Sequence, residues 1–180
     1  VEAMPRATPP QQARYHRTRW VVMALYGMLA RASEFTSARM GDLIQVRRPS
    51  GLQWWWQVRG KHRSQADAPD EVPVPPALMD ELSLYRTHLG LTPLPTPDEA
   101  TPMVVSLYPR RDGWAPLNRT TLWRLIKGLF NAAADAIEPD DPDGAAHLRA
   151  ASPHWLRHTS ITHCLDAGIG LKEVQSLSRH

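Results

Sequence analysis

Cysteine, lysine and long hydrophobic runs are all scarce in this sequence of 180 residues. Its single cysteine, Cys164, excludes an intrachain disulfide and any zinc site built on several thiolates. No apolar run approaches the roughly 18 to 20 residues that a transmembrane helix needs. No basic segment followed by an apolar one resembles an export signal. These absences predict a cytoplasmic protein with no membrane association.

Lysine is also far rarer than arginine. Three lysines stand against eighteen arginines, and the formal net charge is +3 with a pI near 9.4. Arginine has a planar fork of N–H donors that suits two-pronged contact with phosphate, and a positive balance favours a polyanionic partner. A GC-rich genome produces the same excess of arginine without functional meaning. Charge alone therefore leaves the partner open.

The hydrophobic pattern predicts one globular domain. A chain of 180 residues is long enough for one domain with a core and too short for two comfortable ones. Its content of 42 % hydrophobic and 22 % charged residues is typical of a globular protein. Residues 1–12 are rich in proline and polar side chains and are expected to be a linker or a disordered end, with the domain over 13–180. Apolar residues from Trp20 to Leu29 recur at three- and four-residue spacing, which indicates a helix that begins near Ala13.

Short strands and further helices are expected after this first helix. The strand candidates are 43–46, 52–58 and 71–75. Helices are expected from Pro76, from Asn118, from Pro153 behind a Ser152 cap, and over 171–180. This order predicts a mainly helical α+β fold with one small antiparallel sheet of about three strands.

Three consecutive tryptophans lie in the second strand candidate. Alternation along a strand sends Trp54 and Trp56 to one face of the sheet and Trp55 to the other. Indole rings can stack on nucleic acid bases, but packing against the core is the more common use of tryptophan in a sheet. We therefore expect core packing here.

Basic residues gather at the start of the helix that Pro153 opens. His154, Arg157 and His158 are spaced i, i+3 and i+4, which predicts one shared helical face. Free N–H groups and the helix dipole favour an anion at this end, so the set suits a phosphate. The alternatives are a solvated polar face and a zinc site. Zinc is disfavoured because the helix has no glutamate at metalloprotease spacing and Arg157 repels a cation.

Two other basic residues stand at positions with ordinary explanations. Arg31 follows an apolar helix and is expected to end it, and Glu34, three residues on, offers a simple ion-pair partner. Lys61 follows Gly60 at a strand end, where a lysine reaches outward from a hairpin or is simply solvated. Neither residue indicates a function when taken alone.

Together, these segments resemble the tyrosine recombinase (phage integrase) family over about residues 13–180. That family has a Leu-Arg-x-Ser-Glu-Leu box, a hairpin Gly-Lys-Gly, a His-x-Leu-Arg-His box and a Leu-Gly-His box, followed by a tyrosine. The matching segments here, in the same order, are Ala30–Phe35, Gly60–Lys61, His154–Thr159 and Leu177–His180. Two departures are visible: Ser178-Arg179 replaces Leu-Gly, and Lys61 is not followed by glycine.

The resemblance implies a metal-free and cofactor-free enzyme that cleaves and rejoins double-stranded DNA through a 3′-phosphotyrosine intermediate. The catalytic residues it implies are Arg31, Lys61, His154, Arg157 and His180, with Glu34 and His158 as supports that orient them. Arg31, Arg157 and His180 would hold the phosphate, His154 would act as general base or phosphate ligand, and Lys61 would protonate the 5′-oxygen.

The nucleophilic tyrosine is expected beyond His180, because Tyr15, Tyr26, Tyr85 and Tyr108 match no family position. We therefore expect residues 13–180 to be a catalytic domain that is incomplete at its C-terminus, inactive by itself and monomeric, whereas family members form tetramers on DNA. Two alternatives stay open: a type IB topoisomerase, which uses a similar basic set, and a non-catalytic DNA-binding module of the same fold.

Overall fold

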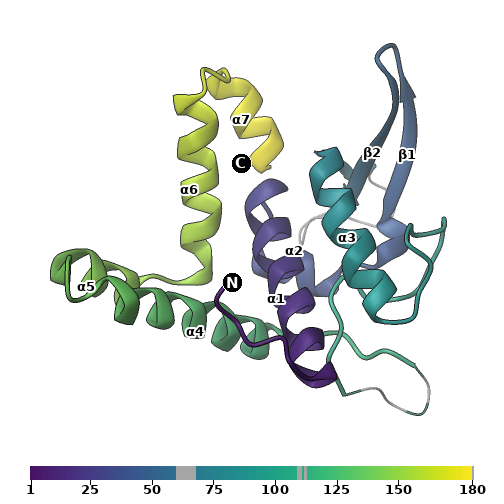
Figure 1. Ribbon diagram of the computed structural model, residues 1–180. Helices are drawn as coiled ribbons and strands as arrows, with labels where there is room; N and C mark the ends of the chain where they lie inside the picture. Colours follow the sequence, from purple (N-terminus) through teal and green to yellow (C-terminus); the bar gives the residue numbers. More distant parts are fainter. Residues whose placement is uncertain (60–67, 109–110, 112, 180) are drawn as a thin grey trace.

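Figure 1 shows the computed structural model, which describes residues 1–59, 68–108, 111 and 113–179. In these residues, seven α-helices, one short 3-10 helix and three strands follow one another. The elements are α1 (Pro9–Gly27), α2 (Ala32–Ser37), η1 (Met40–Asp42), β1 (Leu43–Arg48), β2 (Gly51–Val58), β3 (Asp70–Val74), α3 (Pro76–His88), α4 (Arg119–Ile137), α5 (Pro142–Ala150), α6 (Pro153–Asp166) and α7 (Leu171–Ser178). The predicted α+β class, mainly helical with a small antiparallel sheet, is confirmed.

The sheet is antiparallel with β2 in the centre, and Leu43 of β1 pairs with Trp56 of β2. Trp56 is only 1 % exposed and belongs to the core, and Trp54 packs partly buried against the same core. Trp55 instead lies under the guanidinium of Arg48, which is 4.7 Å from the ring centroid. The predicted alternation and core packing are therefore confirmed.

Helix α1 runs through the middle of the molecule, with α3 and the sheet on one side and α6 on the other (Figure 1). Trp20 of α1 is fully buried, and its indole Nε1 donates a hydrogen bond of 2.8 Å to the carbonyl of Met103. The rings of Phe35 and Tyr85 lie 5.9 and 6.4 Å from that of Trp20. One core therefore joins α1, α2, α3 and the segment that leads to α4.

One helix start and one whole helix, α5, differ from the sequence-based expectation. Helix α1 begins at Pro9, so residues 9–12 belong to its first turn and not to a linker. Helix α5 follows an acidic, proline-containing stretch, where Asp141 caps it by accepting a bond of 2.8 Å from the Gly144 N–H. Both helices have proline at the first position, where a missing N–H costs no intrahelical hydrogen bond.

The last three helices return the chain to its beginning. Helix α5 packs on α4, α6 packs on α1, and α7 then runs back toward the carboxyl end of α1 (Figure 1). Gly168 lies between α6 and α7 with a positive φ of 82°, a conformation that glycine adopts without strain. None of the described helices is long and apolar enough to cross a membrane.

Candidate active site

Arg31 lies in the turn between α1 and α2. Helix α1 ends at Gly27, and Arg31 is the N-cap residue of α2, so the expectation that Arg31 ends the apolar helix is wrong. The Glu34 carboxylate accepts a bond of 2.7 Å from Arg31 Nη1 and another of 3.0 Å from the Arg31 backbone N–H. The predicted ion pair with Glu34 is thus present, and Glu34 holds both the backbone N–H and the guanidinium of Arg31.

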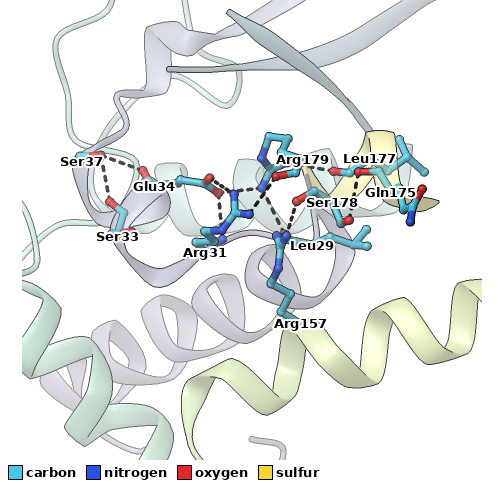
Figure 2. Close-up of polar contacts among 10 residues, drawn as sticks. All are labelled: Leu29, Arg31, Ser33, Glu34, Ser37, Arg157, Gln175, Leu177, Ser178 and Arg179. Atoms are coloured by element: carbon cyan, nitrogen blue, oxygen red, sulfur yellow. Dashed lines mark hydrogen bonds and ion pairs between the residues drawn. The ribbon is translucent and has the colours of Figure 1, made fainter. Parts of the chain in front are cut away.

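Arg157 projects from α6 toward this turn. It is 2 % exposed, and its Nη1 and Nη2 donate to the carbonyls of Leu29 and Ser178 (Figure 2). Leu29 precedes Arg31 and has a positive φ of 47°, which turns its carbonyl into the site. Arg157 therefore ties the end of α7 to the turn that carries Arg31.

Arg179, immediately after α7, completes the group of charged residues. Its Nη2 donates to Glu34 Oε2 at 2.7 Å and to the Leu29 carbonyl at 3.1 Å (Figure 2). We call Arg31, Glu34, Arg157 and Arg179 the arginine cluster. Arg179 was not among the site residues predicted from the sequence, where it is only a departure from the Leu-Gly-His box. An arginine at a position where glycine is usual was the signal that could have drawn attention to it.

The arginine cluster holds three guanidinium groups and one carboxylate. Burial, followed by the charges of Arg31 and Arg179, lowers the pKa of Arg157 to about 10. Burial alone would raise the pKa of Glu34, but hydrogen bonds and charge from Arg179 and Arg31 outweigh burial and keep that pKa below its usual value. The cluster thus has surplus positive charge at neutral pH, which favours an anionic ligand.

A pocket of about 400 Å³ opens beside Arg31, whose side chain is 36 % exposed. His154, at the start of α6, and Arg119, in the first turn of α4, line the same pocket. A helix was expected to start at Asn118, but Arg119 was not among the predicted site residues. Arg31 and His154 are therefore brought together as predicted, with Arg157 buried behind Arg31.

The three residues at the start of α6 do not share one surface. Arg157 points into the core, whereas His154 and His158 are exposed, with their rings in edge-to-face contact at 4.4 Å. The prediction of one common surface is wrong because the boundary between core and solvent runs between Arg157 and the two histidines. His158 makes its ring contact with His154, and within the described residues no hydrogen bond joins it to the arginine cluster. It is thus placed to support only His154.

Two predicted site residues, Lys61 and His180, lie outside the described residues. The zinc alternative gains no support from the described part of the chain, which contains no group of three or more His, Cys, Asp or Glu that could hold a metal ion.

The domain is mainly helical, and hydrogen bonds bring arginines that are far apart in the sequence to one site. The model of the phage integrase family matches residues 1–180, and the chain belongs to that family.

Several curated proteins are similar to this chain. The tyrosine recombinase XerA of Pyrococcus furiosus is 27 % identical over 170 residues, which cover 91 % of this chain and 46 % of XerA. XerA of Thermococcus kodakarensis is 27 % identical over 164 residues, covering 91 % and 47 %. The tyrosine recombinase XerD of Xanthomonas campestris is 33 % identical over 87 residues, covering 48 % and 22 %. The chain thus spans about half the length of the XerA relatives.

Proposed function

We propose that this chain is the catalytic domain of a site-specific DNA recombinase, which cleaves and rejoins DNA through a 3′-phosphotyrosine intermediate. The observation that carries the proposal is the arginine cluster, where three guanidinium groups face one carboxylate. A phosphoryl transition state gathers negative charge on its oxygens, and preorganised cations in a water-poor site stabilise it most effectively. Membership of the phage integrase family supports the same reaction class.

Each basic residue has a proposed task at the scissile phosphate. Arg31 is the guanidinium open to the pocket, so it makes the first contact with a non-bridging oxygen. Arg157 lies behind it and stays protonated at neutral pH, because its pKa of about 10 is well above 7. Glu34 orients Arg31 by accepting from its backbone and its side chain. His180 would supply a third donor to the phosphate.

The proton transfers are assigned to His154 and Lys61. In cleavage, a tyrosine hydroxyl oxygen bonds to phosphorus and the bond from phosphorus to the 5′-oxygen breaks. His154, which lines the pocket beside Arg31, receives the phenolic proton, or else donates to the phosphate. Lys61 gives a proton to the leaving 5′-oxygen. Rejoining reverses each transfer.

None of the four tyrosines, all of them in the described part of the chain, lines the pocket beside Arg31. Tyr15 donates to Glu2, Tyr26 bonds to His163, and the buried Tyr85 accepts from the Val105 N–H. Tyr108 lines a separate pocket at the start of α1. We therefore propose that residues 1–180 alone bind DNA without cleaving it, and that the nucleophile is a tyrosine outside them. We also propose that the full-length protein acts in the cytoplasm as an assembly of protomers on DNA.

Alanine variants of the full-length protein test this proposal. Each of Arg31→Ala and Arg157→Ala is expected to slow cleavage of a nicked duplex substrate by about 100-fold or more, because one preorganised donor at an oxyanion contributes this much. Arg149→Ala is the matched control, since Arg149 pairs with Glu138 on the distant α4–α5 surface. Cleavage at the parent rate by either test variant contradicts the proposal. Covalent attachment of DNA to residues 1–180 alone contradicts the assignment of an outside nucleophile.

A further inference from the structure

Arg179 has a backbone conformation that glycine prefers. Its φ of 57° and ψ of 48° lie in the left-handed region, at the position that caps α7. A side chain is disfavoured there, and glycine is the usual residue at such helix ends. A strained residue persists only where surrounding contacts hold it, and such residues cluster at functional sites.

The contacts that hold Arg179 are made by its side chain. The guanidinium is 4 % exposed and donates to the Glu34 carboxylate at 2.7 Å and to the carbonyls of Leu29 and Leu177 at 3.1 and 3.0 Å. It also lies over the ring of Trp56, 5.6 Å from the centroid. This side chain is thus enclosed by the site and turned away from solvent.

Residue 179 holds Arg31 by two routes. The Arg179 carbonyl accepts from Arg31 Nη2 at 2.9 Å. The Arg179 side chain binds one oxygen of Glu34, and the other oxygen accepts from Arg31 Nη1 at 2.7 Å (Figure 2). Arg31 Nη2 is therefore bonded directly to residue 179, and Arg31 Nη1 is connected to it through the carboxylate of Glu34.

We propose that Arg179 is a positioning residue, which holds Glu34 in place so that Glu34 aims the Arg31 guanidinium at the scissile phosphate. This inference rests on the proposed function. Arg179 is buried whereas Arg31 is open to the pocket, so Arg179 acts on Arg31 without touching DNA. It affects the cleavage step and leaves the affinity for DNA unchanged.

Replacement of Arg179 by glycine removes the side chain that binds Glu34 but keeps the backbone carbonyl that binds Arg31. Glycine also suits the left-handed backbone at this position. In the full-length protein, Arg179→Gly is expected to lower the cleavage rate at saturating DNA by about tenfold to 100-fold, as misplacement of a catalytic group does. The dissociation constant for the same duplex stays within about twofold. The conservative variant Arg179→Lys is expected to keep most of the parent cleavage rate, because its ammonium group also faces Glu34.

The matched control is Asp98→Gly, which also replaces a left-handed residue (φ 60°) by glycine but lies in the loop after α3. It is expected to cleave at the parent rate. Circular dichroism verifies that each variant is folded. If Arg179→Gly does not fold, Arg179→Met serves for the same comparison, because its unbranched stem fills the same space without the charge.

A double-mutant cycle tests the route through Glu34. If Arg179 acts through this carboxylate, Arg179→Gly causes little further loss in a Glu34→Gln background. Rate losses that multiply in full overturn the inference. Parent-like cleavage by Arg179→Gly, with Arg31→Ala impaired, also overturns it and leaves the proposed function intact. Parent-like cleavage by Arg31→Ala instead contradicts the proposed function itself.

Discussion

Glu34 balances the charge of the arginine cluster, and this makes it sensitive to pH. The ion pairs with Arg179 and Arg31 hold its pKa below the ordinary glutamate value in spite of burial. A carboxyl group whose pKa is lower in the folded state than in the unfolded chain stabilises the fold above its unfolded pKa, near 4.3. This stabilisation is lost as the pH falls through the folded-state pKa.

The Glu34→Gln substitution should therefore lower the free energy of unfolding by about 1 to 3 kcal/mol at pH 7, because two guanidinium groups lose a charged partner. The difference from the parent should shrink as the pH falls from the unfolded-state pKa, near 4.3, through the lower folded-state pKa of Glu34. Urea unfolding of residues 1–180 at several pH values measures both effects. Glu138→Gln, on an exposed pair with Arg149, is the control with a smaller effect. A difference that does not change with pH would show that the charge of Glu34 is unimportant.

The surplus positive charge at Arg31 predicts that a small anion stabilises the fold. A ligand that binds only the folded chain raises the free energy of unfolding by about 1.4 kcal/mol at ten times its dissociation constant. Inorganic phosphate should therefore raise the unfolding midpoint above that in chloride of equal ionic strength, and Arg31→Ala should lose most of this rise. Arg149→Ala should keep it. An equal rise in both variants would place the anion outside the arginine cluster.

At the scale of single elements, the two faces of strand β2 lie in different environments, one in the core and one against Arg48. Trp56 faces the core and touches the cluster through the Arg179 guanidinium, while Trp55 on the opposite face stacks with Arg48. The side chain directions follow from the two-residue period of a strand. Strand β2 therefore packs against the arginine cluster with one face, while Trp55 on its other face is only half-buried.

Substitutions on the two faces of β2 should lower the free energy of unfolding by different amounts. Trp56→Ala is expected to lower the free energy of unfolding by about 3 to 5 kcal/mol, because it leaves a large cavity in the core. Trp55→Ala should cost about 1 kcal/mol, the scale of an exposed cation–π contact. The midpoint and slope of urea unfolding for the two variants provide the comparison. Equal losses would contradict the assignment of the two faces.

At the scale of the whole molecule, the fold brings two segments that are 148 positions apart in the sequence to one site. Arg31 follows the first helix and Arg179 follows the last, and they meet because α7 runs back beside the end of α1 (Figure 1). With a net charge of +3 and arginines at the mouth of the pocket, residues 1–180 should bind duplex DNA mainly through phosphates.

Binding to DNA should accordingly depend steeply on salt. If about three phosphates are contacted, the affinity of residues 1–180 for a duplex should fall by one to two orders of magnitude between about 50 and 200 mM salt. Removal of one contact, as in Arg119→Ala, should reduce the slope of log K against log salt by about 1. Fluorescence anisotropy over a salt series measures this slope. Affinity that is independent of salt would contradict phosphate-based binding.

Much of the fold was predictable because its signals are local. The alternation in β2, the Asn118 cap of α4 and the Ser152-Pro153 start of α6 each depend on a few neighbouring residues. The start of α1 at Pro9 and the whole of α5, which begins at Pro142, were missed because proline also marks loops. The Arg31–Glu34 pair was predictable for the same reason, since three residues separate its members.

The sequence by itself determined the mainly helical class, the family boxes and the residue types suited to a phosphate. The tertiary structure alone decided that Arg157 is buried while Arg31 is open, that Arg119 lines the pocket beside Arg31, and that Arg179 shares the carboxylate of Glu34. These contacts join residues that are up to 145 positions apart, and they exist only after packing against the core has fixed the path of α7 and α6. No local pattern encodes such a meeting, because burial and ion pairing depend on which distant segments become neighbours.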